Sequence, residues 1–337
     1  MSHINTDIPE LQGYDSGTVL QNLSSLAARQ MGLDEIRIAY LCELADAICN
    51  DCDNDKDTAE SILTSLRSAI SADDNADGEL LRLTQHLDLL ERLYIYRRIS
   101  GRLWRDGSFF TLPTSDSPLP SDAVGRIAYM KSNLASKAYL KLSAHINGCR
   151  ATEFYSFEDA CAEVVNGQCE YCLLPIESSE AGKLHSFLRL LEKYRLKIAA
   201  VCDIPVRSGV DSPTTRFALL RRNMSGQTVG GELGCINSIS DLFFEDRREN
   251  YRIELIHRPE SGSTSPLTEL LIAAEFCSIS TLRVDTSVHS LSEGDSGIYT
   301  VFGVGGGDVI TFLWYVSLEA PSDTVMGIYP EIGDPAD

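Results

Sequence analysis

The sequence lacks both a long apolar run and a basic leader. Its first residues, MSHINTDIPELQG, contain no basic region followed by an apolar core, and no later run approaches the length that spans a bilayer. We therefore expect a cytoplasmic protein with no membrane partner.

Basic residues are also scarce. The sequence has 29 Lys and Arg but 49 Asp and Glu, which gives a formal charge of −20. This charge repels phosphate groups, so we expect no nucleic acid partner, although a local arginine or helix N-terminus still permits a small anionic ligand.

Cysteine is too dilute for a disulfide scaffold. The ten cysteines are scattered over 337 residues and are expected to be reduced thiols. Cys49 with Cys52 and Cys169 with Cys172 have the spacing of zinc ligands, but the second pair falls at a strand start, where its side chains point to opposite faces or into the core. Two acidic turns imitate the start of a calcium loop but lack the bidentate Glu at its twelfth position. We expect no metal and no cofactor.

Hydrophobic periodicity and composition divide the chain into four segments. Apolar residues with helical spacing predict a helical module over 15–106, and a stretch rich in Pro, Ser and Thr predicts a linker over 107–124. Short strands that alternate with helices predict an α/β lobe with a largely parallel sheet over 125–223. Residues 250–332 predict a small ferredoxin-like α+β domain. The fold class is thus multidomain α/β plus α+β.

The last of these segments has a pattern of strand, helix, strand and hairpin strand. Its elements are centred on 252–257, 266–276, 281–288 and 308–318. The glycine-rich segment Gly303–Asp308 is then a hairpin connection between two strands. A second helix, expected between Leu318 and Val325 in such a domain, is nearly absent from the pattern.

A buried strand that ends in polar side chains is the most informative local pattern. In residues 171–182, YCLLPIESSEAG, an apolar strand runs into Pro175 and then into Glu177, Ser178 and Ser179 before an expected helix. Open α/β sheets place ligand contacts at such strand ends. Taken alone, the pattern also fits a serine that merely caps the following helix.

Four motifs in order resemble those of prephenate dehydratases. The segment PIESS is similar to the family's P-I-E-N-S-x-x-G signature, and residues 154–167 are similar to the helix that precedes it. Residues 214–217, TTRF, look like the family's T-R-F motif, and residues 325–330 resemble its v-L-G-S-Y-P ending. The resemblance implies the conversion of prephenate to phenylpyruvate in phenylalanine biosynthesis, with loss of a carboxylate and a hydroxyl.

The resemblance also implies roles for particular residues. Thr215 would protonate the departing hydroxyl, and Arg216 would bind a substrate carboxylate. The complete set implied to contact substrate is Glu177, Ser178, Ser179, Arg216, Phe217, Ser132 and Asn133. The last two stand in place of the family's glycine-rich G-P-x-G-T turn. Pro205 is followed within ten residues by Thr214, so the family's second lobe does not fit, and the lobe is expected to be a truncated periplasmic-binding-protein-like one.

The C-terminal segment looks like the regulatory ACT domain that senses phenylalanine in this family. The residues that match its two ligand motifs are Ser265, Pro266, Leu267, Thr268, Asp285 and Thr286. The resemblance implies an aromatic amino acid ligand and a homodimer. The helical module stands where bifunctional relatives carry a chorismate mutase domain. Only four basic residues lie between 20 and 75, fewer than a dianion site needs, so a module for dimerisation is the alternative.

Two functions therefore remain open. One is a prephenate dehydratase that uses Thr215 as its acid and takes a small anionic substrate. The other is a non-catalytic relative that senses an amino acid or binds a partner protein through its ACT-like domain.

Overall fold

The structure of the chain is a computed structural model, and it describes residues 39, 41–46, 87–105, 121–146, 148–180, 182–207, 212–222, 251–258, 266–290, 296–320 and 323–332. Within the expected helical module it contains a helical segment at 41–46 and the helix α4 (Leu89–Arg105). Among the described residues, none of the helices combines the length and the apolar character needed to cross a lipid bilayer.

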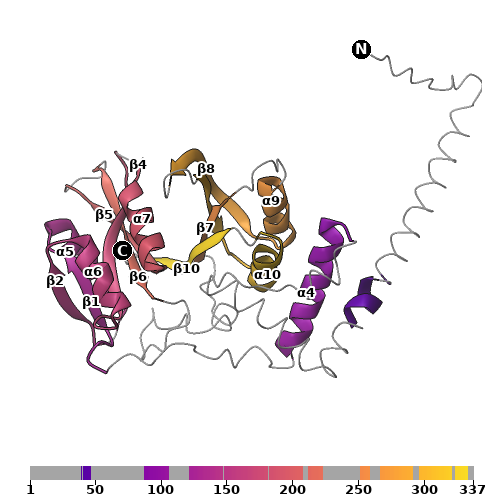
Figure 1. Ribbon diagram of the computed structural model, residues 1–337, viewed down its shortest axis with the longest axis horizontal. Helices are drawn as coiled ribbons and strands as arrows, with labels where there is room; N and C mark the ends of the chain where they lie inside the picture. Colours follow the sequence, from indigo (N-terminus) through magenta and orange to yellow (C-terminus); the bar gives the residue numbers. More distant parts are fainter. Residues whose placement is uncertain are drawn as a thin grey trace, which may run out of the picture.

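An α/β unit follows the helix α4 (Figure 1). Its elements are β1 (Arg126–Met130), α5 (Asn133–Ser143), β2 (Arg150–Phe154), α6 (Phe157–Val165), β3 (Tyr171–Ser178), β4 (Gly182–Lys183), α7 (His185–Tyr194), β5 (Lys197–Pro205) and β6 (Thr214–Arg221). Serine hydroxyls fix the starts of two of these helices, because Ser132 accepts from the Ala135 amide at 3.1 Å and Ser156 from the Asp159 amide at 3.1 Å. These elements confirm the predicted alternation of strands and helices.

The C-terminal unit differs from the sequence prediction in one element. It consists of β7 (Tyr251–His257), α9 (Pro266–Phe276), β8 (Ser280–Ser290), β9 (Ser296–Gly303), α10 (Val309–Glu319) and β10 (Thr324–Ile332). The strand predicted at 308–318 is wrong, because this segment is the helix α10 and the third strand is β9. The segment Gly303–Asp308 accordingly connects β9 to α10 and is not a hairpin, and α10 is the helix that the sequence pattern seemed to lack. The resulting order βαββαβ is that of a split βαβ unit.

All described strands belong to one sheet that runs through both units. Its order is β2-β1-β3-β6-β5-β10-β7-β9-β8, and β4 pairs with β3. Strands β1, β2 and β3 are mutually parallel, but β6 is antiparallel to both β3 and β5. The predicted largely parallel arrangement is therefore confirmed only in part: β1, β2, β3 and β5 run in one direction, whereas β6 forms an antiparallel hairpin with β5 and lies between β5 and β3. The sheet also does not stop at the boundary expected between the two domains, since β10 pairs in parallel with β5.

The junction between β10 and β5 depends on a glycine and a buried lysine. A Cβ on Gly327 would lie 2.5 Å from the Ile198 carbonyl oxygen, so only glycine allows the two backbones to approach this closely. Beside it, the Lys197 ammonium donates to the Val325 carbonyl oxygen at 2.5 Å. Lys197 is 6% exposed, and this burial lowers its pKa to about 8.

Different helices cover the two faces of the sheet (Figure 1). The face that carries α5 is called here the α5 face, and its buried side chains include Ile127, Phe217 and Leu219. The opposite face carries α6 and α7 and is called the α7 face; Ala218, Leu220 and Tyr329 are buried there. In the α/β unit both faces are covered, which explains why the start of β3 is a continuous apolar run.

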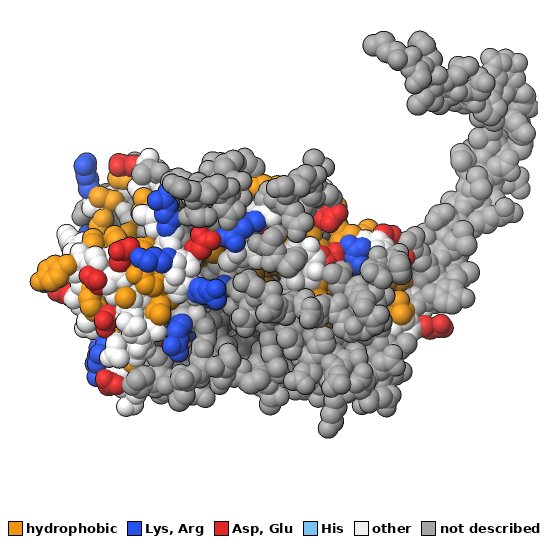
Figure 2. Space-filling view, in the orientation of Figure 1, with side chains coloured by type: hydrophobic (Ala, Val, Ile, Leu, Met, Phe, Trp, Pro, Cys, Tyr) orange, Lys and Arg blue, Asp and Glu red, His pale blue; other side chains and the backbone are white. Residues whose placement is uncertain are grey.

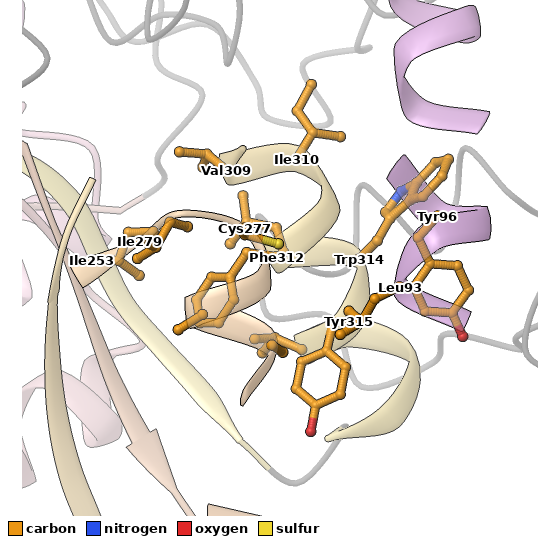
Figure 3. Close-up of a cluster of buried hydrophobic side chains, with 14 of the residues drawn as sticks. Leu93, Tyr96, Ile253, Cys277, Ile279, Val309, Ile310, Phe312, Trp314 and Tyr315 are labelled. Atoms are coloured by element: carbon orange, nitrogen blue, oxygen red, sulfur yellow. The ribbon is translucent and has the colours of Figure 1, made fainter. Parts of the chain in front are cut away.

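The largest core lies in the C-terminal unit, and α4 completes it. Helix α10 is buried all round, with every residue from 309 to 318 buried. Figure 3 shows Leu93 and Tyr96 of α4 beside Trp314 of α10, whereas Phe312 points toward Ile253 of β7 and toward Ile279, which directly precedes β8. Helix α10 thus lies between the sheet and α4, and a helix that is apolar on every side is stable only in such a position.

Candidate functional site

The two most informative motifs lie side by side in the sheet. The end of β3 pairs with the start of β6, so that Glu177 is opposite Arg216 and Ser178 is opposite Thr215. Two hydrogen bonds close this end of the pair: the Ser179 amide donates to the Thr214 carbonyl at 2.9 Å, and the Thr214 amide donates to the Ser179 hydroxyl oxygen at 2.9 Å. The hydroxyl of Ser179, predicted to contact substrate, therefore has a structural partner.

A β-bulge at Pro175 decides which way Glu177 points. The register moves from Pro175 opposite Phe217 to Glu177 opposite Arg216, which leaves Ile176 as the extra residue. Proline cannot donate to a central strand ladder, so it is tolerated at this irregularity. Without the extra residue, strict alternation would put Glu177 on the same face as Phe217. The bulge instead places it with Arg216 on the α7 face.

The predicted catalytic set is consequently divided between the two faces. Thr215 and Ser178 share the α5 face with Phe217, which is buried in the core under α5. Ser132 and Asn133 belong to the start of α5, where the Ser132 hydroxyl is the helix cap. Glu177 and Arg216 lie on the other side of the sheet. The structure therefore brings Thr215 and Ser178 together, but it does not bring Thr215 and Arg216 onto one face.

Arg216 belongs to a cluster of eight charged residues on the α7 face, which we call the charged cluster. Its members are Glu177, Asp203, Arg216, Arg252, Glu254, Arg283, Asp285 and Glu331. Cross-strand registers with residues of the α7-face core, such as Arg252 with Tyr329 and Asp285 with Tyr299, place them on this face. In Figure 2, basic and acidic side chains lie next to one another on the molecular face in view and do not separate into patches of one sign.

Each arginine of the charged cluster is paired with a carboxylate of the same chain. Arg216 forms ion pairs with Glu331 of β10 and, from its Nε atom at 3.8 Å, with Asp203. Arg252 binds the same Glu331 carboxylate at 3.2 Å. These groups are only partly exposed, with 28% for the Arg216 side chain and 30% for that of Glu331. An incoming anion would therefore compete with an existing carboxylate for Arg216.

The other end of the charged cluster joins the two units. Arg283 Nη1 donates to Glu177 Oε1 at 2.6 Å, and Arg283 Nη2 lies 3.5 Å from Asp285 Oδ2. The hydrogen bond to Glu177 raises the pKa of Arg283 above its ordinary value. Nearby, the Tyr329 hydroxyl bonds to the buried Glu254, and burial raises the pKa of this tyrosine well above 10.

Several members of the charged cluster were absent from the sequence prediction. Arg252 with Glu254, and Arg283 with Asp285, are separated by two positions inside predicted strands, and this spacing is a signal for one polar strand face. That signal indicates a charged surface but not its partners. Glu331 carries no comparable signal, because it simply follows the motif that ends at Pro330.

The residues predicted to bind an allosteric ligand lie in different places. Ser265 is outside the described residues, and Pro266 begins α9. Leu267 packs against the core between the sheet, α9 and α10, and Thr268 is exposed. Asp285 belongs to the charged cluster on the opposite face, and Thr286 follows it in β8. Of the two zinc-like pairs, Cys49 and Cys52 lie outside the described residues, and Cys169 and Cys172 are buried thiols.

Fold and site together define a mixed α/β protein with a charged cluster at the junction of its two units. Residues 132–216, about a quarter of the chain, match the family model described as prephenate dehydratase. The match begins at the cap of α5 and ends at Arg216, so it includes both the PIESS and the TTRF segments. This part of the chain is a prephenate dehydratase family region. No curated protein matches the chain.

Solved structures that match this chain include prephenate dehydratases from Streptococcus mutans and Arthrobacter aurescens. The enzyme from Streptococcus mutans is 15% identical with a TM-score of 0.44, covering 62% of this chain and 99% of that one. The enzyme from Arthrobacter aurescens, in complex with L-Phe, is 12% identical with a TM-score of 0.43, covering 63% and 92%. A third, described as GqqA, a novel type of quorum quenching acylase, is 17% identical with a TM-score of 0.41, covering 61% and 94%. The likeness to the prephenate dehydratase family lies in the sequence of residues 132–216.

Proposed function

We propose that this chain is a non-catalytic relative of prephenate dehydratase that senses an amino acid through its C-terminal unit. The observation that carries the proposal is the ion pair between Arg216 and Glu331. By resemblance, Arg216 is the residue that would bind a substrate carboxylate. Here its guanidinium already has a carboxylate from β10 of the same chain, and Arg252 holds that carboxylate in place.

The division of the motif residues between two faces supports the same proposal. A proton donor and a carboxylate-binding residue must contact one substrate at the same time. Thr215 and Arg216 are neighbours in a strand and point to opposite faces of the sheet. The β5–β6 hairpin adds a third argument, because it leaves no insertion that could cover the substrate from the other side.

For the C-terminal unit we propose an ACT-like role with phenylalanine or a similar amino acid as its ligand. The split βαβ order of β7 to β10 supports this proposal, and so does the likeness of the segments 265–268 and 285–286 to the two ACT ligand motifs. We also propose that the protein is a homodimer.

For the helical module we propose a structural role and not a chorismate mutase activity. Three basic residues of α4 support this, since they contact groups of the same chain. Arg92 binds Glu319, Arg97 donates to the Phe276 carbonyl, and Arg98 pairs with Asp46.

A surviving dehydratase activity is the second candidate, and one observation favours it. Thr215 and Ser178 are opposite each other on the α5 face, at the strand ends near the start of α5. A donor hydroxyl, a second hydroxyl and a helix N-terminus are chemically suited to a small anion that loses a hydroxyl group.

Phenylpyruvate formation from prephenate separates the two candidates. With the pure full-length chain we expect no rate above the uncatalysed background at any protein concentration, and the same result for Thr215→Ala. A rate that rises in proportion to wild-type protein and falls in Thr215→Ala would establish the dehydratase and overturn the proposal.

Thermal unfolding with L-phenylalanine tests the sensing role. A ligand at about 100 times its Kd stabilises the folded state by ~2.7 kcal/mol if it binds only that state. We therefore expect a higher Tm with millimolar L-phenylalanine and no change with D-phenylalanine, whose α-carbon has the opposite configuration. An unchanged transition with the L-isomer contradicts sensing.

A further inference from the structure

The ion pair between Arg283 and Glu177 joins strands that are far apart in the sheet. In the strand order β3-β6-β5-β10-β7-β9-β8, six steps separate the strand of Glu177 from that of Arg283. In a flat sheet, six steps of ~4.8 Å would put these strands almost 30 Å apart. The side chains nevertheless meet at 2.6 Å. The sheet must therefore coil back on itself, and this contact closes the coil across the α7 face.

Irregular pairing in the strands makes the coiling possible. β8 changes register between Thr281 and Arg283 and again between Asp285 and His289. β10 changes register against both of its neighbours, and β3 carries the bulge after Pro175. Bulges bend a strand and increase its twist. Arg283 and Asp285 lie between the two irregularities of β8, on the segment that bends toward β3.

Arg283 lies between two carboxylates that belong to different units. Glu177 is the nearer one, at 2.6 Å, and Asp285 of its own strand is 3.5 Å away. The Glu177 side chain is 19% exposed and that of Arg283 is 40% exposed, so the carboxylate is protected from solvent on one side while the guanidinium remains partly solvated. Asp285 also belongs to the segment that resembles an ACT ligand motif. A ligand bound to that segment would compete for Asp285 and so change how Arg283 divides its ionic contacts between Glu177 and Asp285.

In β3, Glu177 directly precedes residues that pair with the TTRF segment of β6. Ser178 and Ser179 follow it, and Ser179 exchanges two hydrogen bonds with Thr214. Glu177 is also opposite Arg216 in the strand pair. Any force that Arg283 exerts on Glu177 therefore acts directly on the paired ends of β3 and β6.

We propose that Arg283 is a positioning residue that holds the Glu177 end of β3 and so couples β8 of the C-terminal unit to the two motifs. The coupling to a ligand rests on the proposed function, since it requires an amino acid at the Asp285–Thr286 segment. The positioning of Glu177 does not depend on any ligand. The two parts are tested by separate measurements on the same variants.

The first measurement is amide hydrogen exchange of the ligand-free, full-length protein. The reporters are the Ser179 and Thr214 amides, whose bonds close the motif pair. Arg283→Met keeps the aliphatic stem and removes the charge, and we expect both amides to exchange about tenfold faster because local opening costs less. Arg283→Lys and the exchanged pair Glu177→Arg with Arg283→Glu restore opposite charges and should recover most of the protection.

The matched control is Lys193→Met, which removes an exposed ion pair with Glu158 between α6 and α7. It should leave both amides unchanged. Unchanged exchange in Arg283→Met, with circular dichroism like that of the wild type, overturns the positioning role. Faster exchange that neither restored pair reduces also overturns it, because the effect would then be general destabilisation and not the loss of this contact.

The second measurement adds L-phenylalanine, with binding followed by calorimetry. We expect the ligand to change the exchange of the two reporter amides at least about threefold in the wild type, and to bind Arg283→Met without that change. An equal change in both proteins overturns the coupling through Arg283 and leaves the proposed function standing. If the wild type binds no L-phenylalanine, the proposed function and the ligand coupling both fall, and the ligand-free comparison alone decides the positioning role.

Discussion

Arg92 of α4 offers the sharpest test of how the helical module is attached. Its Nε and Nη2 atoms donate to the two carboxylate oxygens of Glu319 on α10 at 2.7 and 2.6 Å, and the Tyr96 hydroxyl donates to the same carboxylate at 2.8 Å. The side chains of Arg92 and Glu319 are only 17% and 7% exposed. The substitution Arg92→Met would leave a nearly buried carboxylate with Tyr96 as the remaining donor of the three contacts.

The expected cost follows from that burial. Breaking a buried ion pair by removing one partner costs ~3–5 kcal/mol, and the remaining Tyr96 bond puts this case near the lower end. We expect Arg92→Met to lower the free energy of unfolding by about 3 kcal/mol. Arg92→Lys keeps the charge but loses the two-pronged geometry, so its effect should be intermediate. Urea unfolding followed by circular dichroism and by fluorescence measures these differences.

Arg98→Met is the matched control on the same helix. Arg98 pairs with Asp46 at 3.2 Å, but both side chains are more than 40% exposed. Exposed pairs contribute ~0–1 kcal/mol, so this change should have almost no effect. Equal midpoints for Arg92→Met and Arg98→Met would refute the reasoning, because they would mean that α4 is not docked on α10 through the Glu319 carboxylate.

Two further predictions concern the junction of β5 and β10. Gly327→Ala should destabilise the protein by ~1–3 kcal/mol in urea unfolding, because the new methyl group meets the backbone of Ile198. The control is Gly306→Ala, whose methyl group meets nothing within 4 Å and should change the free energy of unfolding by less than ~0.5 kcal/mol. Equal effects of the two substitutions would contradict the close approach of β10 to β5. Lys197 has a pKa lowered to about 8 in the folded protein, so the unfolded chain binds more protons between pH 8 and 10.5 and stability should rise over that range, by up to ~3 kcal/mol. Lys197→Met should lack this rise, and a wild type that parallels the variant across the range would show that the ammonium is not buried.

The helix α10 shows where sequence patterns reach their limit. Its sequence, VITFLWYVSLE, is apolar almost throughout, and periodicity alone cannot distinguish a buried helix from a buried strand. It is a helix buried on every side because α4, which is more than 200 positions away in sequence, covers its outer face. One local signal was available: Asp308 caps the first turn by accepting from the Thr311 amide at 3.1 Å.

The candidate site was predictable in part. The resemblance implies that residues of the PIESS and TTRF segments contact one substrate, and the pairing of β3 with β6 puts the two segments side by side. The side to which Glu177 points was not predicted, although Pro175 inside a strand is a known signal of a bulge. The partners Glu331 and Arg283 were not predictable, because their positions depend on the coiling of the whole sheet and not on any local pattern.

A chain can keep residues of a catalytic motif without keeping the activity, because these residues also have structural partners. Ser179 bonds to Thr214, Glu177 to Arg283, and Arg216 to Glu331. Each contact is a sufficient physical reason for the residue to be present, whether or not a substrate ever binds. Two of the three contacts reach into the C-terminal unit, so the same side chains that resemble an active site hold the two units in one sheet. A variant of Glu177 or Arg216 therefore reports first on this junction, and a loss of function in such a variant would not by itself establish catalysis.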